Sequence, residues 1–248
     1  MKKVGIIGGS GFYDIPELSQ VSTAPFETRY GRVDALTQGV YEGVEVVFLP
    51  RHGSKHKIPP HKVNYRANID AMSQLGVESI LAFNATGGIH PEFAPETLVV
   101  PDQVIDYTYG REHTFFDGEG SVDESLTHVD FTTPFDETLR QRLKEVLGDK
   151  RANCYFSGTY ACTQGPRLES AAEIKKLQKD GGDLVGMTVM PEAALAKERT
   201  IRYASLCLIV NWCAGLCDEV ITLNKILARL DSSIAEIREV ILKTHTLG

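Results

Sequence analysis

This 248-residue sequence has few of the features that mark membrane, secreted or nucleic-acid-binding proteins. No apolar run reaches the roughly 18 residues that a membrane helix needs. The N-terminus has neither the long apolar core nor the small-residue cleavage site of a signal peptide. Lysine and arginine number 26 against 33 acidic residues, so the net charge is −7 and no basic stripe is present for nucleic acid. We therefore expect a soluble, cytoplasmic protein that binds neither nucleic acid nor a membrane.

Cysteine is also scarce, and the five cysteines do not form the paired pattern of a metal site. Cys213 and Cys217 make a CxxxC motif, which can be interpreted as a redox or metal pair, but no second pair accompanies it. Packed, reduced thiols are the favoured interpretation, and they suit a reducing compartment. His52 and His56 are spaced as helical metal ligands, yet Gly53 between them disfavours a helix. No metal site is predicted.

With 42% hydrophobic residues, the chain is long enough to bury the core of one α/β domain that spans residues 1–248. Strand and helix patterns alternate along it, and a polar segment at 109–128 is predicted to be a lid or an interface arm. The strands are predicted at 3–7, 32–36, 44–49, 77–83, 96–107, 154–163 and 201–212, and the helices at 61–75, 135–147, 170–177, 191–199 and 219–245.

Glycine-rich segments follow two of the predicted strands. Gly8–Gly11 comes directly after the first strand, where backbone N–H groups and the Ser10 hydroxyl can form an anion nest. A second glycine turn is predicted at residues 84–88. The loop that begins at Arg51 is the densest positive segment, and it is interpreted as a mobile loop that offers Arg51 as a phosphate fork; a merely solvated basic loop is the alternative. Ligands collect at such strand ends in α/β sheets.

Four separated motifs resemble the trimeric purine nucleoside phosphorylases and methylthioadenosine phosphorylases. They lie in order between Val4 and Leu230 and read Gly8–Gly11, Arg51–Gly53 with Asn64–Asn68, Gly165–Arg167, and Met187–Glu192. The resemblance implies a phosphorylase-like fold with a mixed central sheet flanked by helices. It also implies a homotrimer with active sites beside neighbouring subunits, and attack of inorganic phosphate on the anomeric carbon of a purine nucleoside. Phosphate is then a co-substrate, and no metal or organic cofactor is needed.

The resemblance also assigns roles to residues. The phosphate site would consist of Ser10, Arg51, His52, Thr188 and the backbone N–H of Ala85. Met187 would form the floor beneath the ribose, and Leu168 would line the nucleoside site next to Glu169. Thr188 could instead, or in addition, cap a helix, since Pro191 and Glu192 follow at suitable spacing.

Asn211 and Glu169 predict which purine is cleaved. The adenine-cleaving relatives carry an aspartate where Asn211 stands and a small hydroxyl residue where Glu169 stands. A 6-oxopurine accepts at O6 and donates from N1–H, so an amide and a carboxylate match it. This pairing favours hypoxanthine or guanine over adenine. The alternative is that Asn211 only ends a strand and that Glu169 only opens a helix.

The group at the 5′ position of the sugar is predicted from Leu223 and His128. Leu223 stands where ordinary riboside phosphorylases place a histidine, and an apolar residue there resembles the methylthio-binding subfamily. The chain departs from both patterns at Cys213–Gly215, so the position of Leu223 could be shifted by one residue, or Leu223 could be plain core. His128 resembles a histidine that the methylthio enzymes lend from an adjacent subunit; the alternative is a solvated loop histidine.

Together these features predict phosphorolysis of 5′-methylthioinosine to hypoxanthine and 5-methylthioribose 1-phosphate, with Asn211, Glu169, Arg51 and Thr188 as the catalytic residues. An inosine or guanosine phosphorylase is the first alternative, and a methylthioadenosine phosphorylase is the second. A nucleoside-binding module without catalysis is the alternative from another class.

Overall fold

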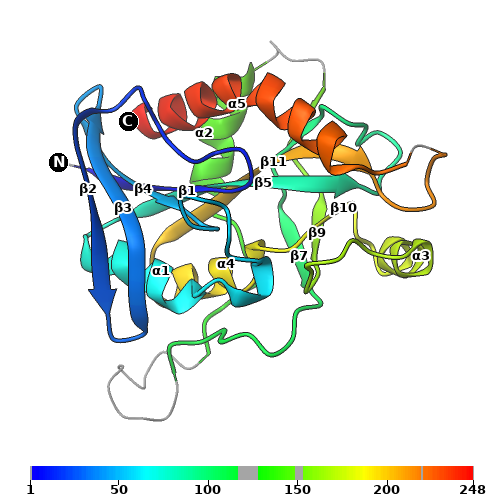
Figure 1. The fold of residues 1–248 in the computed structure, drawn as a ribbon, viewed down its shortest axis with the longest axis horizontal. Coiled ribbons are helices and arrows are strands. Elements are labelled where there is room, and N and C mark those ends of the chain that lie inside the picture. The colour runs from blue at the N-terminus through cyan, green and yellow to red at the C-terminus, as the bar shows by residue number, and fades with distance from the viewer. Residues whose placement is uncertain (1, 117–127, 149–152, 219, 248) are drawn as a thin grey trace.

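The structure is a computed structural model that describes residues 2–116, 128–148, 153–218 and 220–247. Within them, an 11-stranded mixed sheet forms the centre of the molecule, with helices on its faces (Figure 1). The strands are β1 (Lys3–Gly8), β2 (Ser19–Thr28), β3 (Gly31–Tyr41), β4 (Val44–Pro50), β5 (Ser79–Gly88), β6 (Leu98–Val99), β7 (Gln103–Asp106), β8 (Cys154–Tyr155), β9 (Thr159–Cys162), β10 (Leu184–Gly186) and β11 (Arg202–Trp212). The helices are α1 (Tyr65–Gln74), α2 (Glu137–Leu147), α3 (Ala171–Lys179), α4 (Val189–Glu198) and α5 (Leu223–Thr246), with a short 3₁₀ turn at Pro60–Lys62.

Side-chain alternation along the strands divides the core into two layers. On β1 and β4, Ile7 and Leu49 belong to the cluster that includes buried residues of α1 and α4. Their neighbours Ile6 and Phe48 belong to the opposite cluster, which includes residues of α2 and α5. Successive side chains of a strand point to opposite faces, so both faces of these strands are buried. Figure 1 shows α1 and α4 on one face of the sheet and α2 and α5 on the other.

The strand β5 changes its neighbour along its length. Its first half pairs with β1, where Ile7 lies opposite Ala82, whereas its end pairs with β10, where Val185 lies opposite Gly87. β11 runs along the other edge of β5. Residues 83–86 therefore have one edge that no other strand of the described chain covers. Since β1 ends here and β10 runs antiparallel to β5, a gap opens at the carboxyl ends of β1, β4 and β5, where α/β folds bind ligands.

The fold confirms the predicted mixed α/β class and the five predicted helices, and it corrects three segments. β2 was not predicted because its residues are almost all exposed and show no apolar alternation. β10 has only three residues and gives no periodic pattern. The predicted glycine turn at 84–88 is wrong, because these residues continue β5. A Cβ at Gly88 would lie 2.0 Å from the carbonyl oxygen of Phe93, so this glycine allows a close approach of the chain instead of a turn.

Three further predictions concern membrane-spanning helices, the thiols and the polar segment at 109–128. No helix in the described ranges is long and apolar enough to cross a membrane. All five cysteines are free, as predicted. Burial raises the pKa of Cys162 and of Cys207 to about 12, so both stay protonated. The centre of the predicted lid, residues 117–127, lies outside the described residues.

Candidate active site

A pocket of about 400 Å³ occupies the gap beside β5, which is a size suited to a nucleoside-like ligand. It contains every predicted site residue except His128. These are Ser10, Arg51, His52, Ala85, Leu168, Glu169, Met187, Thr188, Asn211 and Leu223. Segments far apart in the sequence therefore meet in one cavity, as the motifs predicted.

The turn after β1 reaches the open edge of β5. A Cβ at Gly9 would lie 2.6 Å from the Phe83 carbonyl oxygen, so only glycine fits there. This contact brings Ser10 to the pocket wall. The backbone N–H of Ala85 lies on the same side of β5 as the Phe83 carbonyl, because main-chain groups alternate along a strand. The Ser10 hydroxyl and the Ala85 N–H consequently lie at the same part of the pocket, beside the open edge of β5.

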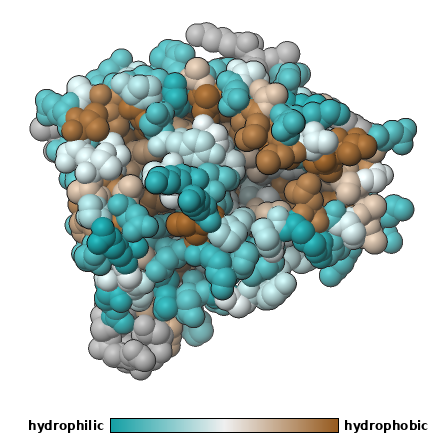
Figure 2. Space-filling view, in the orientation of Figure 1, coloured by the Kyte–Doolittle hydropathy of each residue, from teal (hydrophilic) through white to brown (hydrophobic). Residues whose placement is uncertain are grey.

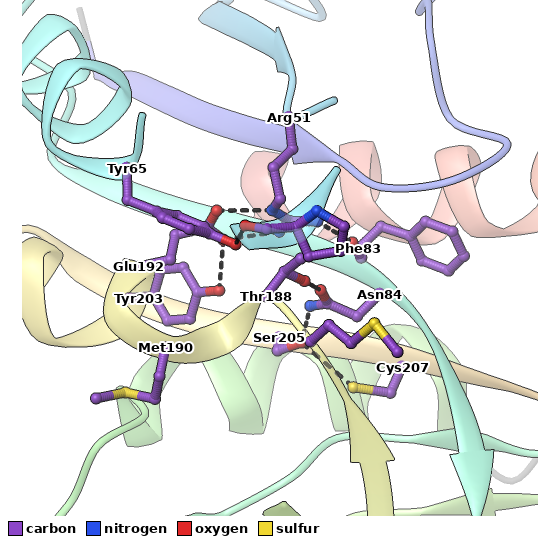
Figure 3. A network of polar contacts seen from close by, with 12 residues as sticks. Arg51, Tyr65, Phe83, Asn84, Thr188, Met190, Glu192, Tyr203, Ser205 and Cys207 are labelled. Atoms are coloured by element: carbon purple, nitrogen blue, oxygen red, sulfur yellow. Dashed lines mark hydrogen bonds and ion pairs between the residues drawn. The ribbon is translucent and has the colours of Figure 1, made fainter. Parts of the chain in front are cut away.

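Arg51 is held by a buried ion pair. Its Nε donates to Glu192 Oε2 and its Nη2 donates to Glu192 Oε1, both at 2.7 Å, while Nη1 donates to the Phe83 carbonyl at 3.1 Å (Figure 3). The hydroxyl of Tyr203 also donates to Glu192 Oε1, at 2.7 Å. Burial alone would lower the pKa of Arg51, but the Glu192 carboxylate outweighs burial and the pKa is raised above its usual value.

The structure restricts the predicted phosphate fork at Arg51, because part of the guanidinium already bonds to the protein. Arg51 is 2% exposed, and Glu192 occupies the edge of the guanidinium that is formed by Nε and Nη2. A guanidinium has five N–H groups, so one remains on Nη1 and one on Nη2. Arg51 lines the pocket with a fixed orientation and these remaining donors.

Thr188 belongs to a chain of buried polar side chains. Its hydroxyl donates to Asn84 Oδ1 at 2.6 Å, and Asn84 Nδ2 donates to Ser205 Oγ at 2.7 Å (Figure 3). Ser205 Oγ in turn lies 3.3 Å from Cys207 Sγ. Thr188 is the N-cap residue of α4 by position, but its side chain makes no capping bond. The predicted N-cap position of Thr188 is thus confirmed, but the side chains of Thr188 and Glu192 form no capping box because they bond elsewhere.

His52 is buried with a fixed tautomer. Its Nδ1 lies 2.8 Å from the Ile58 carbonyl oxygen, which can only accept, so Nδ1 carries the proton and Nε2 is an acceptor. Burial, followed by the charge of Arg51, lowers the pKa of His52 to about 4. The ring of His56 packs edge-on at 4.8 Å between centroids. No group of three potential metal ligands occurs among the described residues.

Glu169 is not required for the helix that follows it. Ser170 caps α3 and forms a capping box with Glu173, so the alternative that Glu169 only opens the helix is not needed. The Thr163 hydroxyl donates to Glu169 Oε1 at 2.6 Å. This bond does not involve the second carboxylate oxygen, Oε2. Glu169 is half-buried in the pocket wall, where its carboxylate can accept a hydrogen bond.

Asn211 lies at the end of β11 and is 8% exposed. Its Nδ2 donates to the Trp212 carbonyl at 2.8 Å, so the amide keeps one N–H and its oxygen for the pocket. Cys213 packs beside it, since a Cβ at Gly87 would meet both Cys213 Sγ and Asn211 Nδ2. Burial and the nearby Glu169 raise the pKa of Cys213, which keeps this thiol neutral.

The N-terminal end of α5 contributes an apolar wall. Leu223 is its first residue and is 68% exposed, so the alternative of plain core is wrong. Ile221 and Ile226 line the same part of the pocket. Hydrophobic surface gathers over this end of α5 and over the loop after β11 (Figure 2). His128 is exposed and does not line the pocket of its own chain.

Sequence reasoning did not assign roles to several residues of this site. Glu192 was noted only as part of the Met187–Glu192 motif and for its spacing from Thr188, although an acidic residue inside an apolar helix is itself a signal of a buried partner. Asn84 was assigned to a turn, and its place on β5 gives it the contact with Thr188. Ile221 and Ile226 carry no local signal that separates them from core residues.

The pocket thus joins main-chain and side-chain donors for an anion to an amide and a carboxylate for a heterocycle. Comparison with known proteins gives the class: residues 3–244 match the phosphorylase superfamily. This chain belongs to that family, and its predicted fold and enzyme class are confirmed.

The relatives are nucleoside phosphorylases. The chain is 48% identical to the probable S-methyl-5′-thioinosine phosphorylase of Pseudomonas syringae pv. tomato, over 96% of each chain. It is 43% identical to the 6-oxopurine nucleoside phosphorylase of Pyrococcus furiosus, which covers 98% of this chain and 91% of that one. Among solved structures, the methylthioadenosine phosphorylase of Schistosoma mansoni in complex with tubercidin superposes with a TM-score of 0.91 and 34% identity, covering 100% of this chain and 91% of that one.

Proposed function

We propose that this protein cleaves 5′-methylthioinosine with inorganic phosphate and releases hypoxanthine and 5-methylthioribose 1-phosphate. The observation that carries the proposal is the pair Asn211 and Glu169, which line one pocket with hydrogen-bonding capacity to spare. Relatives with 44–48% identity are named S-methyl-5′-thioinosine phosphorylases, which supports the same substrate.

Phosphate would bind where Ser10, Ala85, Arg51 and Thr188 converge. The donors for its oxygens are the Ser10 hydroxyl, the Ala85 N–H and the remaining N–H groups of Arg51. Because the Thr188 proton is directed at Asn84, its hydroxyl must rotate to donate to phosphate. His52 presents an acceptor at Nε2, which suits a protonated phosphate oxygen or a sugar hydroxyl. Orienting the nucleophile against the anomeric carbon removes much of the entropic barrier.

The leaving purine would be recognised at the opposite end of the pocket. Negative charge moves into the base as the glycosidic bond breaks, and the free N–H of Asn211 would donate to O6 or N7. The Glu169 carboxylate would accept from N1–H. Adenine places a lone pair at N1, which leaves the Glu169 carboxylate without a donor, and an amine at C6, to which the Asn211 N–H cannot donate. Leaving buried polar groups unpaired in this way can discriminate by roughly 10⁴ or more.

The 5′ group would lie against Leu223, with Ile221 and Ile226 alongside. A methylthio group gains from contact with apolar side chains, whereas a 5′-hydroxyl would lose a hydrogen bond to water there. An inosine or guanosine phosphorylase is the second candidate, and relatives named 6-oxopurine nucleoside phosphorylases at 41–43% identity favour it.

The test is phosphate-dependent turnover of methylthioinosine, inosine and methylthioadenosine, compared by kcat/KM. Methylthioinosine should rank first. A preference for inosine would retain the roles of Asn211 and Glu169 but reject the apolar 5′ pocket. A preference for methylthioadenosine would reject the base assignment. Bound nucleoside with no phosphate-dependent hypoxanthine release would indicate a binding module.

We further propose a cytoplasmic homotrimer that needs no metal or organic cofactor. Free cysteines support a reducing compartment. His128 stands outside the pocket of its own chain, so its proposed role requires a neighbouring subunit. Sedimentation should give three chains per particle, and His128→Ala should weaken nucleoside binding without changing that mass.

A further inference from the structure

Arg111 is a buried cation outside the pocket. It lies in the segment between β7 and residue 116, is 7% exposed and does not line the pocket. The same segment is anchored further along, where the Phe115 N–H donates to Glu198 Oε2 at 2.7 Å. Nothing in the sequence motifs points to Arg111.

The guanidinium of Arg111 lies between segments that form two walls of the pocket. Its six hydrogen-bond acceptors are all neutral oxygens. Nε donates to Gln164 Oε1 at 3.1 Å; Nη1 donates to the Met187 and Met190 carbonyls at 2.9 and 2.6 Å and to the Tyr65 hydroxyl at 3.3 Å; Nη2 donates to the Gln164 and Thr163 carbonyls at 2.9 and 3.3 Å.

These acceptors belong to the residues that present the nucleoside-binding side chains. Thr163 and Gln164 lead into the loop that carries Glu169, and Met187 is itself a pocket residue. The two walls are in contact, since a Cβ at Gly165 would lie 2.4 Å from Met187 Sδ. A shift of either segment would therefore change the space between the base and ribose positions.

A planar guanidinium suits this task better than any other side chain. It offers five N–H groups in a fixed plane, whereas a lysine offers three on a flexible stem. A buried cation with only neutral acceptors is costly to maintain. Arg51 contrasts with it, because the carboxylate of Glu192 neutralises its charge.

We propose that Arg111 is a positioning residue for the purine nucleoside, which fixes the Thr163–Glu169 wall against the Met187–Met190 wall without touching the substrate. This inference rests on the proposed function. Phosphate recognition should depend much less on Arg111. Ser10 and Ala85 are held by β1 and β5, and Arg51 is held by Glu192. Thr188 lies in the Met187–Met190 wall, but its hydroxyl is also tied to Asn84 of β5.

The test is Arg111→Lys with methylthioinosine and phosphate varied separately. We expect kcat/KM for the nucleoside to fall by about 10²-fold, as for misplacement by about 1 Å, while KM for phosphate stays within about twofold. Arg140→Lys is the matched control. Arg140 also donates to main-chain carbonyls, those of Pro101 and Phe156, but it lies outside the pocket. Arg140→Lys should lower Tm but should not lower kcat/KM for the nucleoside selectively.

Two outcomes would overturn the inference: unchanged nucleoside kinetics in folded Arg111→Lys, or an equal loss for nucleoside and phosphate. If Arg111→Lys does not fold, Gln164→Leu takes its place. It removes the side-chain amide whose Oε1 accepts from Arg111 Nε and from the Tyr109 N–H, and it retains the Gln164 carbonyl as an acceptor for Arg111. We expect a loss of about fivefold that is confined to the nucleoside, and an unchanged or uniform result overturns the inference. A wild-type enzyme that releases no hypoxanthine with phosphate would instead reject the proposed function. Even in that case, calorimetry can compare the affinity for hypoxanthine of the wild type with that of Arg111→Lys and Gln164→Leu, so the positioning role of Arg111 stays testable.

Discussion

The two ends of the pocket are built in opposite ways. At the Arg51 end, polar side chains bond to buried protein partners, and Glu192 is 0% exposed. At the Glu169 end, the side chains are less enclosed, and neighbouring Leu168 is 47% exposed. Phosphate, the ligand that we propose for the first end, is small and constant, so a rigid site suits it. The nucleoside must enter and leave, and the more open end can differ between relatives while the fold stays the same.

Removing the buried carboxylate at the Arg51 end should have the largest effect. Glu192→Ala leaves the charge of Arg51 buried without a partner, which costs about 3–5 kcal/mol and releases the guanidinium from its orientation. We expect a large loss of stability in urea unfolding and almost no phosphorolysis. Glu45→Gln, which removes a half-buried surface ion pair with Lys3, is the control and should leave both almost unchanged. A stable, active Glu192→Ala enzyme would contradict the rigid description of this end.

Changing the amide at the other end should alter substrate choice more than stability. Asn211→Asp places a carboxylate beside the oxygen of a 6-oxopurine, so kcat/KM for methylthioinosine should fall by about 10²–10³-fold, and methylthioadenosine should be favoured relative to wild type. KM for phosphate should stay nearly constant. Asn153→Asp, on an exposed residue outside the pocket, serves as control. Unchanged discrimination between the two nucleosides would remove the role of Asn211.

Acid should destabilise the Arg51 end through His52. The pKa of His52 is about 4 in the folded chain, against the ordinary histidine value of 6.5, which applies in the unfolded chain. Between these pH values the unfolded chain binds the extra proton, so the free energy of unfolding falls as pH drops from 6.5 to about 4. The contribution is at most about 3 kcal/mol. His52→Asn, whose amide can replace Nδ1 at the Ile58 carbonyl, should show a shallower decline.

The decline must be measured as a difference between the two proteins, because His245 is also buried with a pKa lowered to about 3. Urea unfolding from pH 8 to pH 4 gives this difference. Identical pH profiles of wild type and His52→Asn would show that His52 is not neutral in the folded chain.

The smallest effect is expected at the exposed wall of the 5′ group. Leu223→Ser should reduce kcat/KM for methylthioinosine by about tenfold and leave inosine almost unaffected, since about one methyl-sized contact is lost. Leu227→Ser, on an exposed residue of the same helix that does not line the pocket, should change neither substrate. Equal losses for both nucleosides at Leu223 would place the methylthio group elsewhere.

Much of the fold was predictable because its central elements have clear periods. The apolar runs of β1, β4 and β11 predict buried strands, and the face of α5 with Ile237 and Ile241 predicts a packed helix. β2 and β10 were missed because an exposed edge strand and a three-residue strand lack any period. The motif spacing also placed most of the pocket residues correctly, since strand ends in one sheet converge.

The amino-acid sequence by itself determined the α/β class, the residues at the strand ends and the amide and carboxylate that match an oxopurine. Only the tertiary structure decided that Arg51 is paired with Glu192, that Thr188 bonds to Asn84 and that Arg111 joins two pocket walls. Along the chain, Arg51 is 141 residues from Glu192, Thr188 is 104 residues from Asn84, and Arg111 is 79 residues from Met190. No local pattern encodes such contacts, because they arise only when the packed core brings distant segments within hydrogen-bonding distance.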